Sequence, residues 1–240
     1  VLDAKEKEVE AEIALEKAKW DHYASTFKMQ FGTEAPIMKD IIDSDVEQKK
    51  GNLIIAQHNL NKAYTDLNIL VGITPDARPV LTTEVVYEPL EITGINSEVG
   101  RAISSNVNVW AALQNVIIEK EDLRMTLKPY EIEKMEIEVA ELTADGAKEE
   151  LEKGLRGLYH DILSLEEAIN ASKGGVKAAE TGLKAAEVRY DVGMATEGDL
   201  LESKATLAIA KKTQAQLKYQ HATATAAYRN LTGREVLPTN

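Results

Sequence analysis

The sequence contains no cysteine and few aromatic residues, and both shortages limit what the chain can be. Phe, Trp and Tyr together make up 5% of its 240 residues, and Cys is absent. The lack of Cys excludes disulfide bonds, thiolate metal sites and cysteine nucleophiles. With so few aromatic rings, the 44% of hydrophobic residues must be buried in many thin layers. This composition favours helices packed on helices.

Basic residues are outnumbered by acidic ones, and long apolar runs are missing. The formal net charge is -12. Nucleic-acid binding needs a clustered basic surface, so we expect no nucleic-acid partner, and anionic membrane surfaces are disfavoured for the same reason. No run reaches the roughly 18 to 20 apolar residues of a membrane-spanning helix. No signal peptide is visible, and Val1 opens directly into a helical pattern, so we expect the chain to be trimmed at its N-terminus.

Side chains that could build a catalytic or metal site are scattered along the chain. The four histidines stand singly, at positions 22, 58, 160 and 221, without the close spacing of metal ligands. The carboxylates between Glu131 and Glu138 follow a solvated helix face rather than forming an opposed acid pair. Gly174 and Gly175 follow a helical pattern, not a strand, so they form no phosphate loop. We therefore expect a protein that is not an enzyme, with no catalytic residue, cofactor or metal.

The clearest positive signal is a heptad-like stripe in the C-terminal half. Steps of four and three residues alternate, with only Ser172 interrupting. The stripe contains Leu151, Leu155, Leu158, Ile162, Leu165, Ile169, Val176, Ala179, Leu183, Ala186 and Tyr190. Such a repeat predicts one long helix, from about residue 132 to 190, in a left-handed coiled coil. We expect glycines within it, from Gly146 to Gly175, to mark kinks or close helix contacts.

A turn and a second helix follow this stripe. Gly193 suits a helix C-terminus, and Thr196 can cap the next helix, which runs to about Leu231. Two antiparallel helices joined by a tight turn are therefore predicted. Tyr190 continues the apolar stripe, so it is interpreted either as a core residue or as a hydrogen-bonding residue of the turn. Asp199 is interpreted as favourable to the helix dipole or to the cap, or as a gating or ion-binding residue.

The N-terminal part repeats this plan. An apolar stripe from Val9 to Phe27 predicts one helix, residues 31–36 a turn, and a second stripe a return helix that ends at Gly72. The interval from Gly32 to Gly72 is 40 residues, the same as from Gly193 to Gly233. At the common offset of 161 positions, Leu60, Ala63, Leu67 and Leu70 fall on His221, Ala224, Tyr228 and Leu231, although the match drifts near the turn. This correspondence indicates an internal duplication.

Residues between the two hairpins favour an extended linker and then two shorter helices. Pro75, Pro79 and Pro89, with the β-favouring segment Val85-Val86-Tyr87, predict an extended linker. Helix is predicted again from Ser97, with a pause at Asn106, and from about residue 107 to 127. We therefore predict an all-α fold of long antiparallel coiled-coil hairpins, with little or no β-structure. It is a single elongated domain over 1–240: a first repeat at 1–72, a linker at 73–95, a second repeat at 96–233 and a tail at 234–240.

Several of these segments resemble the TolC-like outer membrane efflux protein family. The stretch from Ala185 to Leu201, which contains Arg189-Tyr190-Asp191-Val192-Gly193-Met194-Ala195-Thr196, is similar to the family's second repeat, as is the Ala-rich helix that ends Tyr228-Arg229-Asn230-Leu231-Thr232-Gly233. Residues 31–72 are similar to the first repeat's turn and return helix, and 106–112 to the helix that opens the second repeat. Each motif is weak alone, but their order and the duplication agree with the family.

The resemblance implies a function. Members of the family form ducts of three subunits, topped by an outer-membrane β-barrel, through which an inner-membrane pump and a periplasmic adaptor protein export molecules. It implies a TolC-like α-barrel subunit, a homotrimer, and an exported protein of the cell envelope, periplasmic or associated with the outer membrane. The turns between the paired helices would face the adaptor. The implied site residues are Gly32, Thr33, Tyr190, Gly193, Thr196 and Asp199.

The sequence also departs from the family. Between Leu127 and Ile132 there is no room for the β-hairpin that family members carry, so the hairpin of the second repeat is expected to be absent. Ala195 stands where the family's turn often has a basic residue. Two functions therefore stay open: a passive export duct, and a structural coiled-coil scaffold or spacer in the cell envelope that keeps the fold without a channel.

Overall fold

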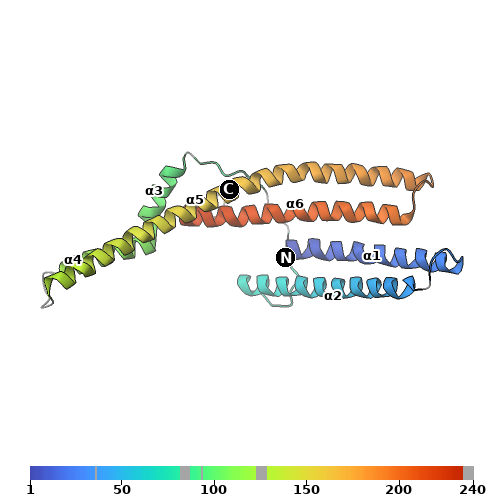
Figure 1. Cartoon of the computed structure of the whole chain (residues 1–240), viewed down its shortest axis with the longest axis horizontal. Helices are drawn as coiled ribbons and strands as arrows, with labels where there is room; N and C mark the ends of the chain where they lie inside the picture. The colour runs from blue at the N-terminus through green and yellow to red at the C-terminus, as the bar shows by residue number, and fades with distance from the viewer. Residues whose placement is uncertain (36, 82–86, 93, 123–128, 235–240) are drawn as a thin grey trace. The chain divides into compact units, whose positions relative to one another are not determined.

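The structure is a computed structural model that describes residues 1–35, 37–81, 87–92, 94–122 and 129–234. In these ranges the chain forms six α-helices and no strand, which confirms the predicted all-α fold. The helices, labelled in Figure 1, are α1 (Leu2–Gln30), α2 (Met38–Val71), α3 (Ile95–Ser105), α4 (Val107–Asp122), α5 (Tyr130–Asp191) and α6 (Glu197–Leu231).

The predicted helix boundaries agree closely with the structure. The long helix predicted from about 132 to 190 is α5, and the pause predicted at Asn106 is an extended residue that separates α3 from α4. The side chain of Asn106 accepts hydrogen bonds from the backbone N–H groups of Asn108 and Val109, as an N-cap does. The β-favouring pair Val85-Val86 and the end of the helix predicted to residue 127 lie outside the described residues.

The heptad stripe of α5 points inward as predicted, except at its last member. Leu155, Ile162, Ile169 and Ala186 are buried, and the other members are partly buried, whereas Tyr190 is 42% exposed. The helix runs without interruption through its glycines. A Cβ atom at any glycine from 146 to 175 would meet nothing within 4 Å. The expectation of close helix contacts at these glycines is therefore wrong.

Four helices end with the same glycine-centred motif. Gly32, Gly72, Gly193 and Gly233 adopt φ values between 65° and 76°. In each case the glycine N–H donates to the carbonyl three residues back, and the next N–H donates to the carbonyl five residues back. This is the Schellman arrangement, in which only glycine adopts the left-handed conformation without cost. The two glycine pairs that the sequence aligns at an offset of 161 are thus structurally equivalent.

The chain divides into two compact units, of which unit 1 takes residues from both repeats and unit 2 takes residues from the linker, the second repeat and the tail. Unit 1 comprises residues 1–84 and 168–217, and unit 2 comprises 85–167 and 218–240. Unit 1 therefore contains α1, α2, the C-terminal part of α5 and most of α6. Within it α1 packs along α2, and the turn at residues 192–196 joins α5 to α6 (Figure 1).

Unit 2 contains the larger hydrophobic core. Val99 and Ala102 of α3, Leu155 and Ile162 of α5, and Tyr228 of α6 form one buried cluster. Residues Leu90 and Ile92 of the linker pack against it. A second, smaller cluster joins Val116 of α4 to Ala140 and Ala144 of α5. Unit 2 is thus held together by side chains that are far apart in the sequence.

The linker is attached to unit 2 through polar groups as well. The backbone N–H of Leu90 donates to Glu166 Oε1 at 2.7 Å, and His221 Nε2 lies 3.4 Å from the same oxygen. Tyr87 packs edge-on against the His221 ring. Burial raises the pKa of Tyr87, and the carboxylates of Glu166 and Glu167 add to this effect.

Candidate functional site

Hydrogen bonds from α1 hold the first hairpin turn, at residues 31–35 and 37, in place. Gly32 and Thr33 close the end of α1, and the Thr33 hydroxyl donates to the Lys28 carbonyl at 2.9 Å. The buried Ser25 hydroxyl donates to Glu34 Oε2 at 2.7 Å. Phe31, which stacks on Phe27 with ring centroids 4.7 Å apart, is 68% exposed. The turn therefore has a fixed backbone and an apolar outer surface.

The second hairpin turn, at residues 192–196, begins α6 with a reciprocal cap. The backbone N–H and hydroxyl of Thr196 donate to Asp199 Oδ2 at 2.8 and 2.7 Å, and the Asp199 N–H donates back to the Thr196 hydroxyl at 3.2 Å. This is a capping box with Asp in place of the usual Glu. These hydrogen bonds hold the pKa of Asp199 below its ordinary value. The cap interpretation of Thr196 and Asp199 is therefore confirmed.

This turn also exposes apolar side chains. Val192 is 63% exposed and Met194 80% exposed, and Tyr190 lies beside them in sequence. Tyr190 does not act as a core residue, since almost half of it is accessible. Both turns thus present a rigid glycine backbone surrounded by exposed apolar groups, a combination suited to binding another protein rather than to chemistry.

Trp20 ties α1 to the beginning of α6. A Cβ atom built at Gly198 would lie 2.5 Å from Trp20 Nε1 and 2.7 Å from Trp20 Cδ1. Only glycine therefore leaves room for the indole ring over the first turn of α6. The sequence could not reveal Trp20 and Gly198 as partners, because they are far apart in the chain and the apolar stripe that contains Trp20 does not indicate which helix it contacts.

Polar side chains also join α1 to α6 at several points, and we call this set of contacts the α1–α6 seam. Lys212 donates to Glu10 at 2.6 Å, and Gln216 donates to Asp3 at 2.9 Å. Burial acts to raise the pKa of Asp3, but hydrogen bonds from Lys7 and Gln216 outweigh it and lower that pKa. Lys17 lies 3.9 Å from Glu202. The pairing runs antiparallel, because residues early in α1 meet residues late in α6.

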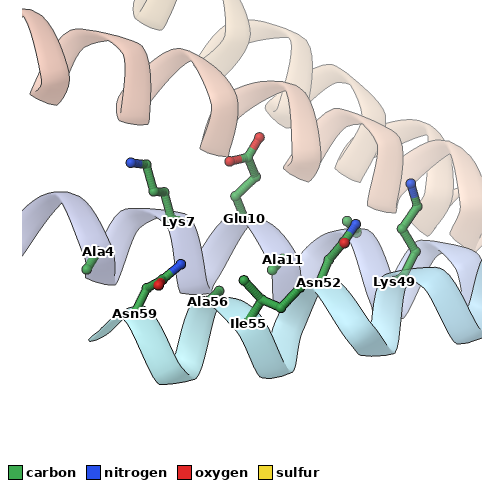
Figure 2. Close-up of a pocket in the computed structure, with 10 residues that line it drawn as sticks. Ala4, Lys7, Glu10, Ala11, Lys49, Asn52, Ile55, Ala56 and Asn59 are labelled. Carbon is green, nitrogen blue, oxygen red and sulfur yellow. The ribbon is translucent and has the colours of Figure 1, made fainter. Parts of the chain in front are cut away.

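A hollow of 370 Å³ lies between α1 and α2, away from the turns. Figure 2 shows its walls of Ala4, Ala11, Ala56 and Ile55, with Asn52 and Asn59 on the α2 side. Its charged groups are engaged elsewhere: Lys7 pairs with Asp3, Glu10 with Lys212 and Lys49 with Asp45. Because no set of reactive groups converges on it, the hollow offers no site for acid–base or nucleophilic chemistry.

The described ranges contain neither a cluster of metal ligands nor a membrane-spanning helix. No group of three His, Asp or Glu side chains there could hold a metal ion. His22 contacts Asp43 at 2.8 Å and His221 contacts Glu166, so these two histidines belong to separate pairs. No described helix is long and apolar enough to cross a bilayer.

The comparisons with known proteins agree with the fold and the turns. The outer membrane efflux protein family matches residues 121–234. No curated protein sequence matches the chain significantly. Among solved structures, the channel protein CusC, reported for its folding and transmembrane channel formation, is similar with a TM-score of 0.74 and 12% identity, covering 98% of this chain and 74% of that chain.

Two further structures show the same likeness. The outer membrane protein VceC of Vibrio cholerae has a TM-score of 0.59 at 15% identity, covering 98% of this chain and 67% of that one. The outer membrane channel CmeC of Campylobacter jejuni has a TM-score of 0.56 at 13% identity, covering 97% of this chain and 60% of that one. At such identities these likenesses establish the fold, while the match at residues 121–234 covers the second hairpin and its turn. Residues 121–234 therefore match the outer membrane efflux protein family, and the chain has the fold of these outer membrane channel proteins.

Proposed function

We propose that the chain is a subunit of an envelope-spanning export duct, a passive conduit that assembles as a homotrimer. The observation that carries the proposal is the row of four helices in unit 1. Contacts tie α2 to α1 and α1 to α6, and the second turn joins α6 to α5, so the row ends in two unlike edges (Figure 1). Unlike edges that meet head to tail close into a ring when the rotation allows.

Both edges of this row carry exposed apolar side chains. On α2, Ile41 is 58% exposed, and on α5 Val188 is 63% exposed. Large apolar groups exposed along helix edges are typical of surfaces that another subunit covers. Packing of α2 from one copy against α5 of the next would bury them. A closed ring of helical rows would then enclose a passage, and conduction through it requires no covalent step.

We propose further that the two hairpin turns face a periplasmic adaptor protein, which connects the duct to an inner-membrane transporter. Gly32, Thr33, Gly193, Thr196 and Asp199 would form the rigid backbone of that surface, with Tyr190 beside them. Opening would occur by relative movement of the two hairpins. The α1–α6 seam supports this, because exposed ion pairs such as Lys17–Glu202 add little to stability and separate at low cost.

Cross-linking tests the ring directly, since the chain has no cysteine of its own. Ile41→Cys and Val188→Cys place one thiol on each edge near the turns. In the double variant, oxidation is expected to yield covalent trimers on non-reducing gels. Each single variant can form only dimers and serves as the control. Light scattering over a concentration series should show a trimer for the unmodified chain.

The alternative outcome is equally informative. A strict monomer at high concentration, with no cross-linked trimer, would contradict the ring and favour the envelope scaffold.

For the adaptor surface, Met194→Asp should reduce binding of a purified adaptor at least tenfold without changing the mass of the assembly. Unchanged adaptor binding would contradict the placement of the second turn in that interface while leaving the ring unaffected.

A further inference from the structure

The N-terminal part of α5 carries a second apolar stripe, on a face that α4 does not cover. Its members follow one another in steps of three, four and three residues: Ile132, Met135, Val139 and Leu142. All four side chains are exposed, Val139 to 62%. The face that meets α4 is a different one, since Ala140 and Ala144 are buried against Val116 there. Heptad spacing is the pattern by which one helix receives another, so the exposed stripe indicates a helical partner.

This stripe forms one wall of a groove of 460 Å³ between α4 and α5, which we call the α4–α5 groove. Ile132, Met135 and Val139 line its α5 wall, and Glu119 and Asp122 line its α4 wall. The small apolar cluster of unit 2 fixes the two helices to each other. The groove therefore has one apolar wall and one acidic wall.

The charges of the groove decide which kind of helix fits it. Glu119, Asp122 and Glu136 line it, and none of the described residues around it is basic. Lys120, which is close by in the sequence, pairs with Glu141 at 2.6 Å. A second copy of this chain, with its net charge of -12, would bring further carboxylates to the groove, and like charges placed together oppose association. A helix with an apolar face flanked by Lys or Arg complements both walls.

We propose that the α4–α5 groove is a docking site for a basic amphipathic helix of a partner protein. The apolar face of that helix packs on Ile132, Met135 and Val139, and its cations pair with Glu119 and Asp122. The stripe extends over about 15 Å, so about three turns of the docked helix are in contact. The groove is formed by one chain and lies within unit 2, so the inference does not depend on the proposed ring.

A synthetic helical peptide of Leu and Lys, about five turns long, tests the site on the full chain. Leu occupies the heptad core positions of the peptide, and a fluorophore at its end allows fluorescence anisotropy to give Kd. A peptide with Glu in place of every Lys is the matched probe and should bind at least tenfold more weakly. Added salt should weaken binding of the Lys peptide, since exposed charges are screened. Equal binding of both peptides would overturn the charge assignment.

Two double variants separate the groove from the general acidity of the chain. Glu119→Gln with Asp122→Asn should weaken binding of the Lys peptide at least tenfold. Glu149→Gln with Glu150→Gln removes the same charge from exposed positions of α5 outside the groove, so it should weaken binding less than twofold. Equal affinities of the two double variants would overturn the proposal.

Disulfide trapping locates the bound peptide, because the chain has no cysteine of its own. A Lys peptide with one Cys among its core positions should become joined to Val139→Cys on oxidation. It should not become joined to Ile209→Cys, which replaces an exposed apolar residue of α6. Disulfide dimers of Val139→Cys formed in preference to the peptide adduct would assign the groove to a second copy and overturn the proposal.

Discussion

Thr196 and Asp199 close the N-terminus of α6 with reciprocal hydrogen bonds, and their effect can be measured one residue at a time. Thr196→Ala removes the hydroxyl that both accepts from and donates to Asp199. Loss of an N-cap side chain costs about 1 kcal/mol of stability. Urea unfolding should show this loss, whereas Thr206→Ala, at an exposed site in the middle of α6, should change stability by no more than a few tenths.

The same substitution should change the pKa of Asp199 and therefore the dependence of stability on pH. The Asp199 pKa is lowered in the folded chain, so its contribution to stability is complete above the ordinary Asp pKa of 3.8 and is lost as the pH falls through the folded pKa. In Thr196→Ala the pKa should return toward the ordinary value. NMR titration of the Asp199 carboxyl carbon checks this, and an unchanged pKa would show that the Thr196 hydroxyl does not contribute to the shift, since the backbone N–H bond stays in the variant.

A substitution at Gly198 tests the position of the Trp20 ring. Gly198→Ala places a methyl group where the indole ring lies, so the ring must move toward water and its fluorescence should shift to longer wavelength. The chain has two tryptophans, so the measurement uses a Trp110→Phe background. Gly182→Ala is the control, because a Cβ there meets nothing within 4 Å. Equal emission in the two variants would contradict the contact.

Single residues could be predicted from the sequence where their role depends only on their near neighbours in the chain. Gly193 and Thr196 were identified because a helix C-terminus and an N-cap each select particular residue types. The contact between Trp20 and Gly198 could not be predicted from the sequence, since it depends on how two hairpins pack together. The pairing of Glu98 with Arg234 could not be predicted either, because 136 positions separate the two residues.

At the scale of helices, glycines in turns and glycines within α5 should respond oppositely to the same substitution. Gly193 has φ of 72°, which costs a non-glycine residue about 1–3 kcal/mol. Gly193→Ala should therefore destabilise the chain. Gly146 lies within α5 with open space around it, so Gly146→Ala should stabilise it by about 0.5–1 kcal/mol. Thermal unfolding of both variants checks the signs, and two shifts of the same direction would contradict this account.

Helix boundaries were predictable because the heptad stripe and the glycines set them independently. The stripe fixed the buried face of α5 as far as Ala186, but at Tyr190 the α5–α6 hairpin is nearly at its turn, and the side chain is exposed. Periodicity alone cannot reveal where a partner helix stops covering a stripe. The division into units was equally hidden, because both units draw on α5 and α6.

At the scale of the whole molecule, the two units differ in how their buried apolar side chains are grouped. Both identified hydrophobic clusters belong to unit 2, whereas buried apolar residues of unit 1 such as Leu15, Ala56 and Leu201 are spread along its helices. Regions with fewer buried apolar contacts open at lower free energy. Backbone amides of α1 and α2 should therefore exchange with deuterium faster than those of α5 between residues 150 and 167.

Mass-spectrometric hydrogen exchange on the isolated chain checks this prediction. Comparison with the cross-linked assembly gives a control, because covering the α2 edge should slow exchange in α2 and leave the core of unit 2 unchanged. Equal exchange of α2 and of residues 150–167 in the isolated chain would contradict the unequal distribution of stability.

The equal glycine intervals restrict how this chain can change in length. Gly32 and Gly193 begin return segments of 40 residues each, and the contact of Trp20 with Gly198 fixes the register of one hairpin against the other. A heptad inserted into the α5–α6 hairpin alone would carry its turn about 10 Å past the first one and break that contact. Lengthening is compatible with the contact only when both hairpins gain the same number of residues, so insertions in this lineage should occur in matched pairs.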